Sequence, residues 1–256
     1  MIDNYNVNFG NANALHINLA DMTFLGGNGA NKPATGVSWN QAARFVNWLN
    51  TSTGSFAAYK FTTGGVNDNI VAWTESDTDD YDPLNLFRSR RAKFVLPNLN
   101  EWYKAAYYDP SNNTYYTFPT GSNLTPISVA SGTIANTAVY GQSVTANVDE
   151  AGGLSPYGVM GLGGNVAEFL ESNFYQDFDV TENRAIRGGH IFSNDFQLSS
   201  SFQHLISSSR TGVQNYGFRV ASLSSSAPPA VPEPSMMVIG TLFGLGGLVA
   251  KRRMKK

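Results

Sequence analysis

Two segments of the chain carry apolar residues at helical spacing, and each is preceded by a residue that can cap a helix. The first follows Ser38, whose hydroxyl can accept from the first turn, with Gln41 at the capping-box position three residues on. Gly54 is a natural stop. The apolar positions between them are Ala42, Phe45, Val46 and Leu49. We predict one helix between Ser38 and Gly54.

The second segment pairs a short strand with a helix. Residues 94–96 are apolar and end at Pro97, which cannot donate to a strand ladder. Asn98 then caps a helix with Glu101 as its box partner, so we assign Glu101 to capping before catalysis. The buried stripe of this helix is predicted to be Leu99, Trp102, Tyr103 and Ala106.

Most of the remaining chain alternates short apolar pieces with turn residues. Residues 51–91 and 109–153 are rich in Gly, Asn, Ser and Thr and are predicted to be loops with weak strands. The first of them holds four clustered aspartates, but without the glycine and terminal glutamate of an EF-hand. We interpret that cluster as a solvated loop.

Glycines concentrate in residues 155–169, SPYGVMGLGGNVAEF. Glycine is needed where φ is positive or where two backbones approach closely, so this stretch predicts a tight irregular loop. Its inward carbonyls, with Glu168, can form an all-oxygen cage for a hard cation such as calcium. The alternative, which the residues alone leave open, is that Asn165 and Glu168 cap backbone groups in a buried turn.

The same stretch resembles the "YGL…GNVWEW" signature of the formylglycine-generating enzyme, or sulfatase-modifying factor, family. Three further segments match in order, within residues 33–50, 94–108 and 184–222. The resemblance implies an α+β fold of C-type-lectin type. That fold is irregular and loop-rich, with two helices and small antiparallel sheets. Family members normally begin earlier, which suggests a truncated start in residues 1–32.

Two arginines lie in the last of these matching segments. Arg187 belongs to an RGG triplet and Arg219 to a GFR triplet. Arginine binds carboxylates and carbonyls through several parallel N–H groups. We therefore expect both residues to fasten the terminal strands to buried carbonyls or carboxylates and not to touch a substrate.

Family members bind calcium at two places, and the resemblance carries one of them over. Matching "GNVAE" to "GNxWE" makes the carbonyls of Gly164 and Val166 and the carboxylate of Glu168 calcium ligands. Gly161 stands where the family usually has Asn or Asp, so we expect a weakened site. The other site would start at Ala135 and Asn136. Its spacing is shorter than in the family, which predicts that it is lost or rebuilt.

The copper chemistry of the family's oxidases is expected to be absent. Those enzymes hold copper through two cysteines, and the aligned positions here are Ser193 and Leu198. The chain contains no cysteine, so no thiolate can bind copper elsewhere, and we predict no copper and no formylglycine generation. The three histidines have no metal-ligand spacing. A nucleophilic set of Ser193, His190 and Asp195 lacks a nucleophile elbow and is interpreted as an ordinary loop.

The charge distribution and the C-terminal tail indicate what kinds of partner the protein has. Charged residues make up only 14% of the chain, and basic residues cluster at 251–256, leaving an acidic body that disfavours nucleic-acid binding. Pro232, Glu233 and Pro234 precede an apolar run, residues 235–250, that spans about 24 Å as a helix against a hydrocarbon core of roughly 30 Å. Pro-Glu-Pro, an apolar helix and a basic end resemble a PEP-CTERM sorting signal. That resemblance implies bacterial export, a single-pass membrane anchor and processing by an exosortase.

These expectations divide the chain into residues 1–32, a family domain at 33–222, a linker at 223–231 and a sorting signal at 232–256. We predict a non-catalytic, surface-associated binding module in the cell envelope, with an extracellular glycan or protein ligand. The alternative is an enzyme of unknown chemistry that uses the same cleft without copper cysteines.

Overall fold

The computed structural model describes residues 31–65, 68–173, 183–206 and 215–223. The chain divides into two units, Met1–Ser224 and Ser225–Lys256, and the described residues all belong to the first. Its helices are α1 (Trp39–Ser52), α2 (Leu99–Tyr107) and the 3₁₀ helix η2 (Asp195–Leu198). Its strands are β1 (Phe94–Val95), β2 (Tyr108–Asp109), β3 (Thr114–Tyr115), β4 (Ile127–Ser128), β5 (Thr137–Ala138), β6 (Ala167–Asn173), β7 (Arg184–Arg187), β8 (His204–Ile206), β9 (Tyr216–Phe218) and β10 (Ala221–Ser222).

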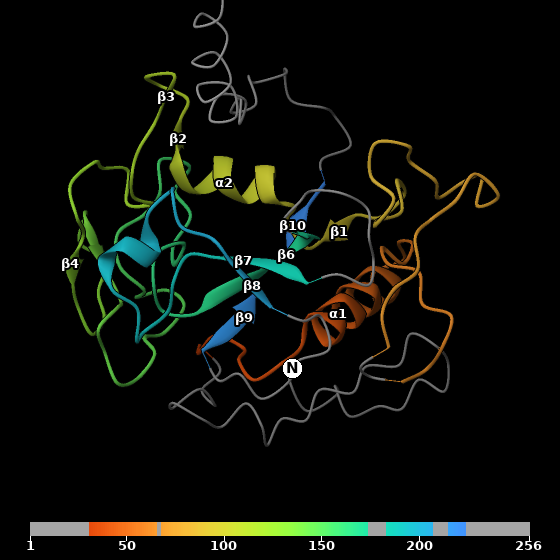
Figure 1. Ribbon diagram of the computed structural model, residues 1–256, viewed down its shortest axis with the longest axis horizontal. Coiled ribbons are helices and arrows are strands. Elements are labelled where there is room, and N and C mark those ends of the chain that lie inside the picture. The colour runs from red at the N-terminus through yellow and green to blue at the C-terminus, as the bar shows by residue number, and fades with distance from the viewer. Residues whose placement is uncertain (1–30, 66–67, 174–182, 207–214, 224–256) are drawn as a thin grey trace, which may run out of the picture. The chain divides into compact units, whose positions relative to one another are not determined.

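A four-stranded sheet in the order β8-β7-β6-β9 lies at the centre of the unit (Figure 1). The β6·β7 and β7·β8 pairs are antiparallel, whereas β6 and β9 run parallel. The expected α+β class with two helices and small sheets is confirmed, but the sheets are not purely antiparallel. β9, which follows β7 and β8 in the chain, pairs with the edge of β6 that β7 leaves free.

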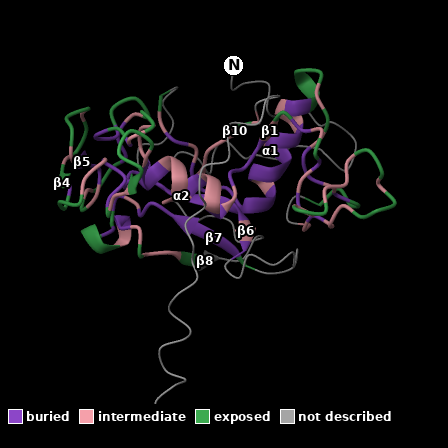
Figure 2. Cartoon of the chain, turned by 90° about the horizontal axis from the view of Figure 1, so that it is seen from above, coloured by how far each residue is buried: buried purple, intermediate pink, exposed green. Residues whose placement is uncertain are grey.

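The two helices pack on opposite faces of this sheet. Trp39, Ala42 and Val46 of α1 share a buried cluster with Phe169 and Ile186. The other face buries Leu99, Trp102 and Ala106 of α2 against Leu170 of β6 and Ala185 of β7. Successive strand residues alternate between faces, so one strand serves both clusters. Figure 2 shows the buried residues gathered in α1, β6 and β7, with exposed residues in the surrounding loops.

Both predicted helix starts are confirmed. The Ser38 hydroxyl accepts from the backbone N–H of Gln41 at 3.1 Å, and the Gln41 amide oxygen accepts in return from the Ser38 N–H at 2.7 Å. Asn98 and Glu101 form the same reciprocal pair, at 2.8 Å in both directions. These local contacts satisfy backbone donors that a helix N-terminus otherwise leaves free.

The loop regions are irregular, as predicted, and the acidic cluster is occupied by ion pairs. Lys60 binds Asp77 at 2.7 Å, and Arg91 binds Asp80 at 2.7 Å. These pairs fasten one part of the loop to another, which supports the interpretation of a surface loop. No helix among the described residues has the length and apolar character needed to cross a bilayer.

Candidate functional site

The glycine-rich loop packs directly against the chain around Val139. Gly164 has φ +79°, and a Cβ there would lie 2.2 Å from the Val139 carbonyl oxygen. Asn165 also has positive φ, and its backbone N–H donates to the same oxygen at 2.7 Å. The predicted need for positive φ and close backbone approach is confirmed, and the loop leads straight into β6.

The polar residues of this loop have different roles. The Asn165 side chain pairs with the backbone of Ala146, accepting from its N–H at 2.9 Å. Glu168 instead binds side chains. Its carboxylate accepts from Nε and Nη2 of Arg219 at 2.5 Å each, and from the Trp102 indole N–H at 2.7 Å. Burial works against the charged guanidinium, but the charge of Glu168 outweighs it and raises the pKa of Arg219.

In this arrangement, a calcium ion at Gly164, Val166 and Glu168 would compete with Arg219 for the Glu168 carboxylate. Both oxygens of Glu168 already face a guanidinium cation, so a calcium ion would have to displace Arg219. Among the described residues, no three His, Asp or Glu side chains converge as a group that can hold a metal ion. The weakened calcium site stays a prediction, with Arg219 as the competitor.

The two positions aligned with copper cysteines have structural roles. Leu198 is fully buried and packs with Phe118 and Ala138. Ser193 is 3% exposed, and its hydroxyl accepts from the backbone N–H of His190 at 2.9 Å. One position therefore fills a core and the other closes a turn.

A small hollow of about 90 Å³, partly open to solvent, lies beside these two positions on the α1 face of the sheet. Its floor is formed by residues on neighbouring strands. Ile186 of β7 lies opposite His204 of β8, and Ala167 of β6 lies opposite Tyr216 of β9. Residues that lie opposite each other in paired strands point to the same face of the sheet. The wall comes from the last residue of β7 and from the chain that follows it. It consists of Arg187, Gly189, His190, Ser193, Gln197 and Phe202. We call this hollow the sheet-face pocket.

Two histidines that the sequence leaves scattered meet in this pocket. His190 accepts at Nδ1 from the Phe192 N–H at 3.2 Å, so the proton of its neutral ring is on Nε2. Burial, and then the nearby His204, lower the pKa of His190. The strand pairing of β7 with β8 brings His204 into place, and no spacing in the sequence signals it.

The nucleophilic set of Ser193, His190 and Asp195 is not assembled. The Ser193 hydroxyl meets the backbone of His190, and the Asp195 carboxylate accepts from the Phe196 N–H at 2.9 Å. No hydrogen bond in the described part of the chain joins the hydroxyl to the imidazole or the imidazole to the carboxylate. The interpretation as a loop is supported.

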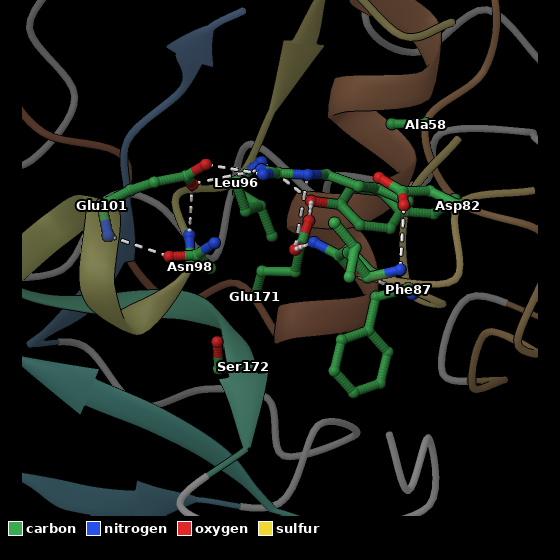
Figure 3. Close-up of polar contacts among 12 residues, drawn as sticks. Ala58, Asp82, Phe87, Leu96, Asn98, Glu101, Glu171 and Ser172 are labelled. Atoms are coloured by element: carbon green, nitrogen blue, oxygen red, sulfur yellow. Dashed lines mark hydrogen bonds and ion pairs between the residues drawn. The ribbon is translucent and has the colours of Figure 1, made fainter. Parts of the chain in front are cut away.

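A second charged cluster, missed at the level of sequence, joins β6 to the loop before β1. Figure 3 shows Glu171 of β6 and Glu101 of α2 on either side of a guanidinium, which belongs to Arg88. Glu171 is fully buried and accepts from Asn85 at 2.6 Å and from the Tyr59 hydroxyl at 3.0 Å. Burial raises the pKa of Glu171 despite Arg88. The cluster has a partner for each oxygen, so we assign it to fastening the loop.

The predicted anchoring role of the terminal arginines is confirmed. Arg187 donates to the carbonyls of Ser200 at 3.0 Å and Phe202 at 2.9 Å. Arg219 binds Glu168 and the Met160 carbonyl. The sorting motif Pro232, Glu233 and Pro234, the apolar run and the basic end lie outside the described residues.

Comparison with known proteins agrees with this architecture. Residues 19–223 match the family described as "Sulfatase-modifying factor enzyme 1-like domain". Two solved structures share the fold. Treponema denticola variable protein 1 has a TM-score of 0.53 at 22% identity, covering 78% of this chain and 76% of that one. The structure titled "Crystal Structure of CarF" has a TM-score of 0.53 at 19% identity, covering 79% and 71%. No curated protein sequence gives a significant match. With most of its length inside one family match, the chain belongs to the sulfatase-modifying factor enzyme 1-like domain family.

Proposed function

We propose that this domain is a non-catalytic binding module of the cell envelope and that the sheet-face pocket is its ligand site. The observation that carries the proposal is the structural use of both copper positions. Leu198 is buried in a core cluster, and the Ser193 hydroxyl closes a turn. With no cysteine in the chain, thiolate-based copper chemistry has no ligands.

The pocket itself supports binding in preference to chemistry. Its polar groups come from a rigid sheet and from a turn locked by Ser193, which suits a preformed site. Within the described chain, the pocket histidines have no carboxylate or hydroxyl partner of the kind that activates a nucleophile. What remains is a small concave surface with aromatic, amide and imidazole groups on a fixed scaffold.

Binding arrays of glycans and envelope proteins, probed with the full chain, test the ligand-site proposal. Ala167→Leu fills the pocket from β6, and Gln197→Ala removes an amide from its wall; both are expected to reduce capture. Leu124→Ala, at a residue 72% exposed outside the pocket lining, is the matched control. Capture that survives both pocket variants would place the ligand elsewhere.

A copper-binding experiment tests the proposal that the domain is not catalytic. The full chain is expected to retain no stoichiometric copper and to leave a cysteine-containing peptide unoxidised. Copper uptake with turnover of the peptide would overturn this part of the proposal.

The envelope location rests on the sequence of residues 232–256. Exosortase processing near Pro232, Glu233 and Pro234 should release a shortened chain in a host that has the exosortase. The same host without the enzyme should keep the full-length chain in its membrane fraction. Mass spectrometry of the C-terminus distinguishes the two, and identical products in both hosts would remove the sorting proposal.

A further inference from the structure

The outer edge of β4 is open. The backbone N–H groups of Ile127 and Val129 donate to the carbonyls of Asn136 and Ala138 at 2.9 and 3.0 Å, so both point towards β5. The hydrogen-bonding groups of successive strand residues alternate between the two sides of the strand, so the N–H and C=O of Ser128 point away from β5. Neither group has a partner among the described residues, and Ser128 is exposed.

The stretch of chain around this edge is uncharged and partly apolar. Residues 110–148 contain no Asp, Glu, Lys, Arg or His. Ile127 is 66% exposed. Ile134 is 72% exposed, and its carbonyl accepts from the Thr137 hydroxyl at 2.7 Å, at the start of β5. Figure 2 shows β4 and β5 at the periphery of the unit, beside exposed loops. Edge strands are normally protected by charged side chains, and the sequence supplies none along this stretch.

The charge distribution indicates which partner can meet this edge. Acidic residues outnumber basic ones ahead of residue 251, so two copies of this part of the chain repel each other overall. Contact through residues 110–148 places no like charges of these residues opposite each other, and it removes exposed isoleucine side chains from water. This stretch therefore suits contact between two copies of an acidic chain.

We infer that β4 pairs with β4 of a second copy of this chain, about a two-fold axis through Ser128, to form a symmetric dimer. In an antiparallel pair, opposite residues can exchange both backbone hydrogen bonds, so the free N–H and C=O of one Ser128 match those of the other. The same register sets Ile127 of each copy opposite the partner's Val129, on one face of the joined sheet. The inference goes beyond the proposed binding function and does not depend on it.

The surroundings of Ser128 favour a second copy over an extended peptide of another protein. Pro126 has no N–H to add to the outer edge, so the ladder is short. A peptide gains little beyond the two bonds at Ser128, whereas a second copy brings its own Ile127 and a preformed pair of strands. The Ser128 hydroxyl donates to the Tyr140 carbonyl and accepts from the Gln142 amide at 2.9 Å. These bonds hold β4 in place before a partner arrives, which lowers the cost of pairing.

Sedimentation velocity of the full chain, from about 1 to 300 µM, measures the association. The contact is small, so we expect a weak dimer with a dissociation constant on the order of 10 µM. Added salt should not weaken the dimer, because the pairing uses backbone groups and isoleucine and no ion pairs. A single monomeric species throughout the concentration range overturns the inference, and so does a dimer that salt dissociates.

Matched lysine substitutions locate the contact. Ile127→Lys should raise the dissociation constant at least about tenfold, because the ammonium group loses water at the contact. Leu84→Lys, at a residue 86% exposed and outside residues 110–148, is the control and should leave the dimer unchanged. Both positions are exposed, so the far-UV circular dichroism of either variant should match wild type. Association that survives Ile127→Lys, or that both variants weaken equally, overturns the inference.

A cross-link tests the register. The chain contains no cysteine, so Ser128→Cys introduces a single thiol, and two such thiols lie across the proposed axis. Opposite residues that exchange both hydrogen bonds have Cα atoms about 5.5 Å apart, within disulfide range. Mild oxidation should convert Ser128→Cys into a covalent dimer on a non-reducing gel, and Leu84→Cys should stay monomeric. No cross-link in Ser128→Cys, or an equal yield in both variants, overturns pairing at Ser128. Capture on the binding arrays decides the proposed function separately.

Discussion

Arg219 follows β9 and holds Glu168 of β6 through two hydrogen bonds, from Nε and Nη2 to the two carboxylate oxygens, each at 2.5 Å. The side chains are 26% and 5% exposed, respectively. The pair ties the last part of the domain to its central strand, at the end of the glycine-rich loop. Trp102 of α2 adds a third donor to the same carboxylate.

Arg219→Ala should destabilise the domain by about 3 kcal/mol, because removing one partner leaves a buried charge without its counter-ion. Urea denaturation of the full chain measures the change. The control is Glu75→Ala, at an exposed carboxylate, which should alter the free energy of unfolding by less than about 0.5 kcal/mol. Equal effects of the two substitutions would show that the Arg219–Glu168 pair does not stabilise the domain as expected.

Calcium should compete with Arg219 for Glu168. We expect the wild-type chain to bind calcium weakly, Arg219→Gln to bind it more tightly, and Glu168→Ala to lose it. Calorimetric titration with calcium chloride tests the series. Tight binding that is the same with and without the guanidinium would contradict competition, and no heat in Arg219→Gln would remove the calcium site itself.

Alanine substitutions at two glycines of the same loop distinguish the cost of a left-handed backbone from the cost of a steric clash. Gly158 has φ +75°, and a Cβ there would meet no described atom within 4 Å, whereas a Cβ on Gly164, at φ +79°, would lie 2.2 Å from the Val139 carbonyl oxygen. Gly158→Ala should therefore cost about 1–2 kcal/mol from the left-handed backbone alone. Gly164→Ala should cost clearly more in the same unfolding experiment, and similar costs would contradict the tight packing against Val139.

Buried Glu171 should make stability depend on pH. Its pKa is raised in the folded state by burial, against the charge of Arg88, so the folded chain holds this proton more strongly than the unfolded chain. The stabilising contribution is fully present below the ordinary glutamate pKa and is lost as pH rises through the raised value.

Glu171→Gln removes this titration and keeps an oxygen for Asn85. The stability of the variant relative to wild type should rise as pH increases from about 4.5 towards neutrality, as measured by urea denaturation at a series of pH values. A constant difference across that range would show that Glu171 has an ordinary pKa in the folded chain.

Ser38→Ala should cost about 1 kcal/mol, because it removes the hydroxyl that accepts from the Gln41 N–H at the start of α1. Ser38→Gly should cost only a few tenths of a kcal/mol if capping geometry dominates. The comparison uses thermal or urea unfolding, with Ser52→Ala at the exposed end of the same helix as control. An effect of Ser52→Ala as large as that of Ser38→Ala would contradict the capping assignment.

The sequence by itself determined the local features of this protein. Ser38 with Gln41, Asn98 with Glu101 and the glycines of residues 155–169 act within a few residues of chain, so spacing and residue type were enough to predict their roles. Ordered motifs also indicated the family, and the missing cysteines excluded thiolate copper chemistry.

Only the tertiary structure decided which distant residues meet. The pairing of β7 with β8 and of β6 with β9 brings His190, His204 and Tyr216 to one pocket, and it sets Arg219 against Glu168. The spacing of apolar residues along the chain does not predict these contacts. Strand order and register depend on the simultaneous burial of one face of the sheet against α1 and of the other against α2. The parallel β6·β9 pair likewise joins segments far apart in the sequence, and no local pattern predicts it.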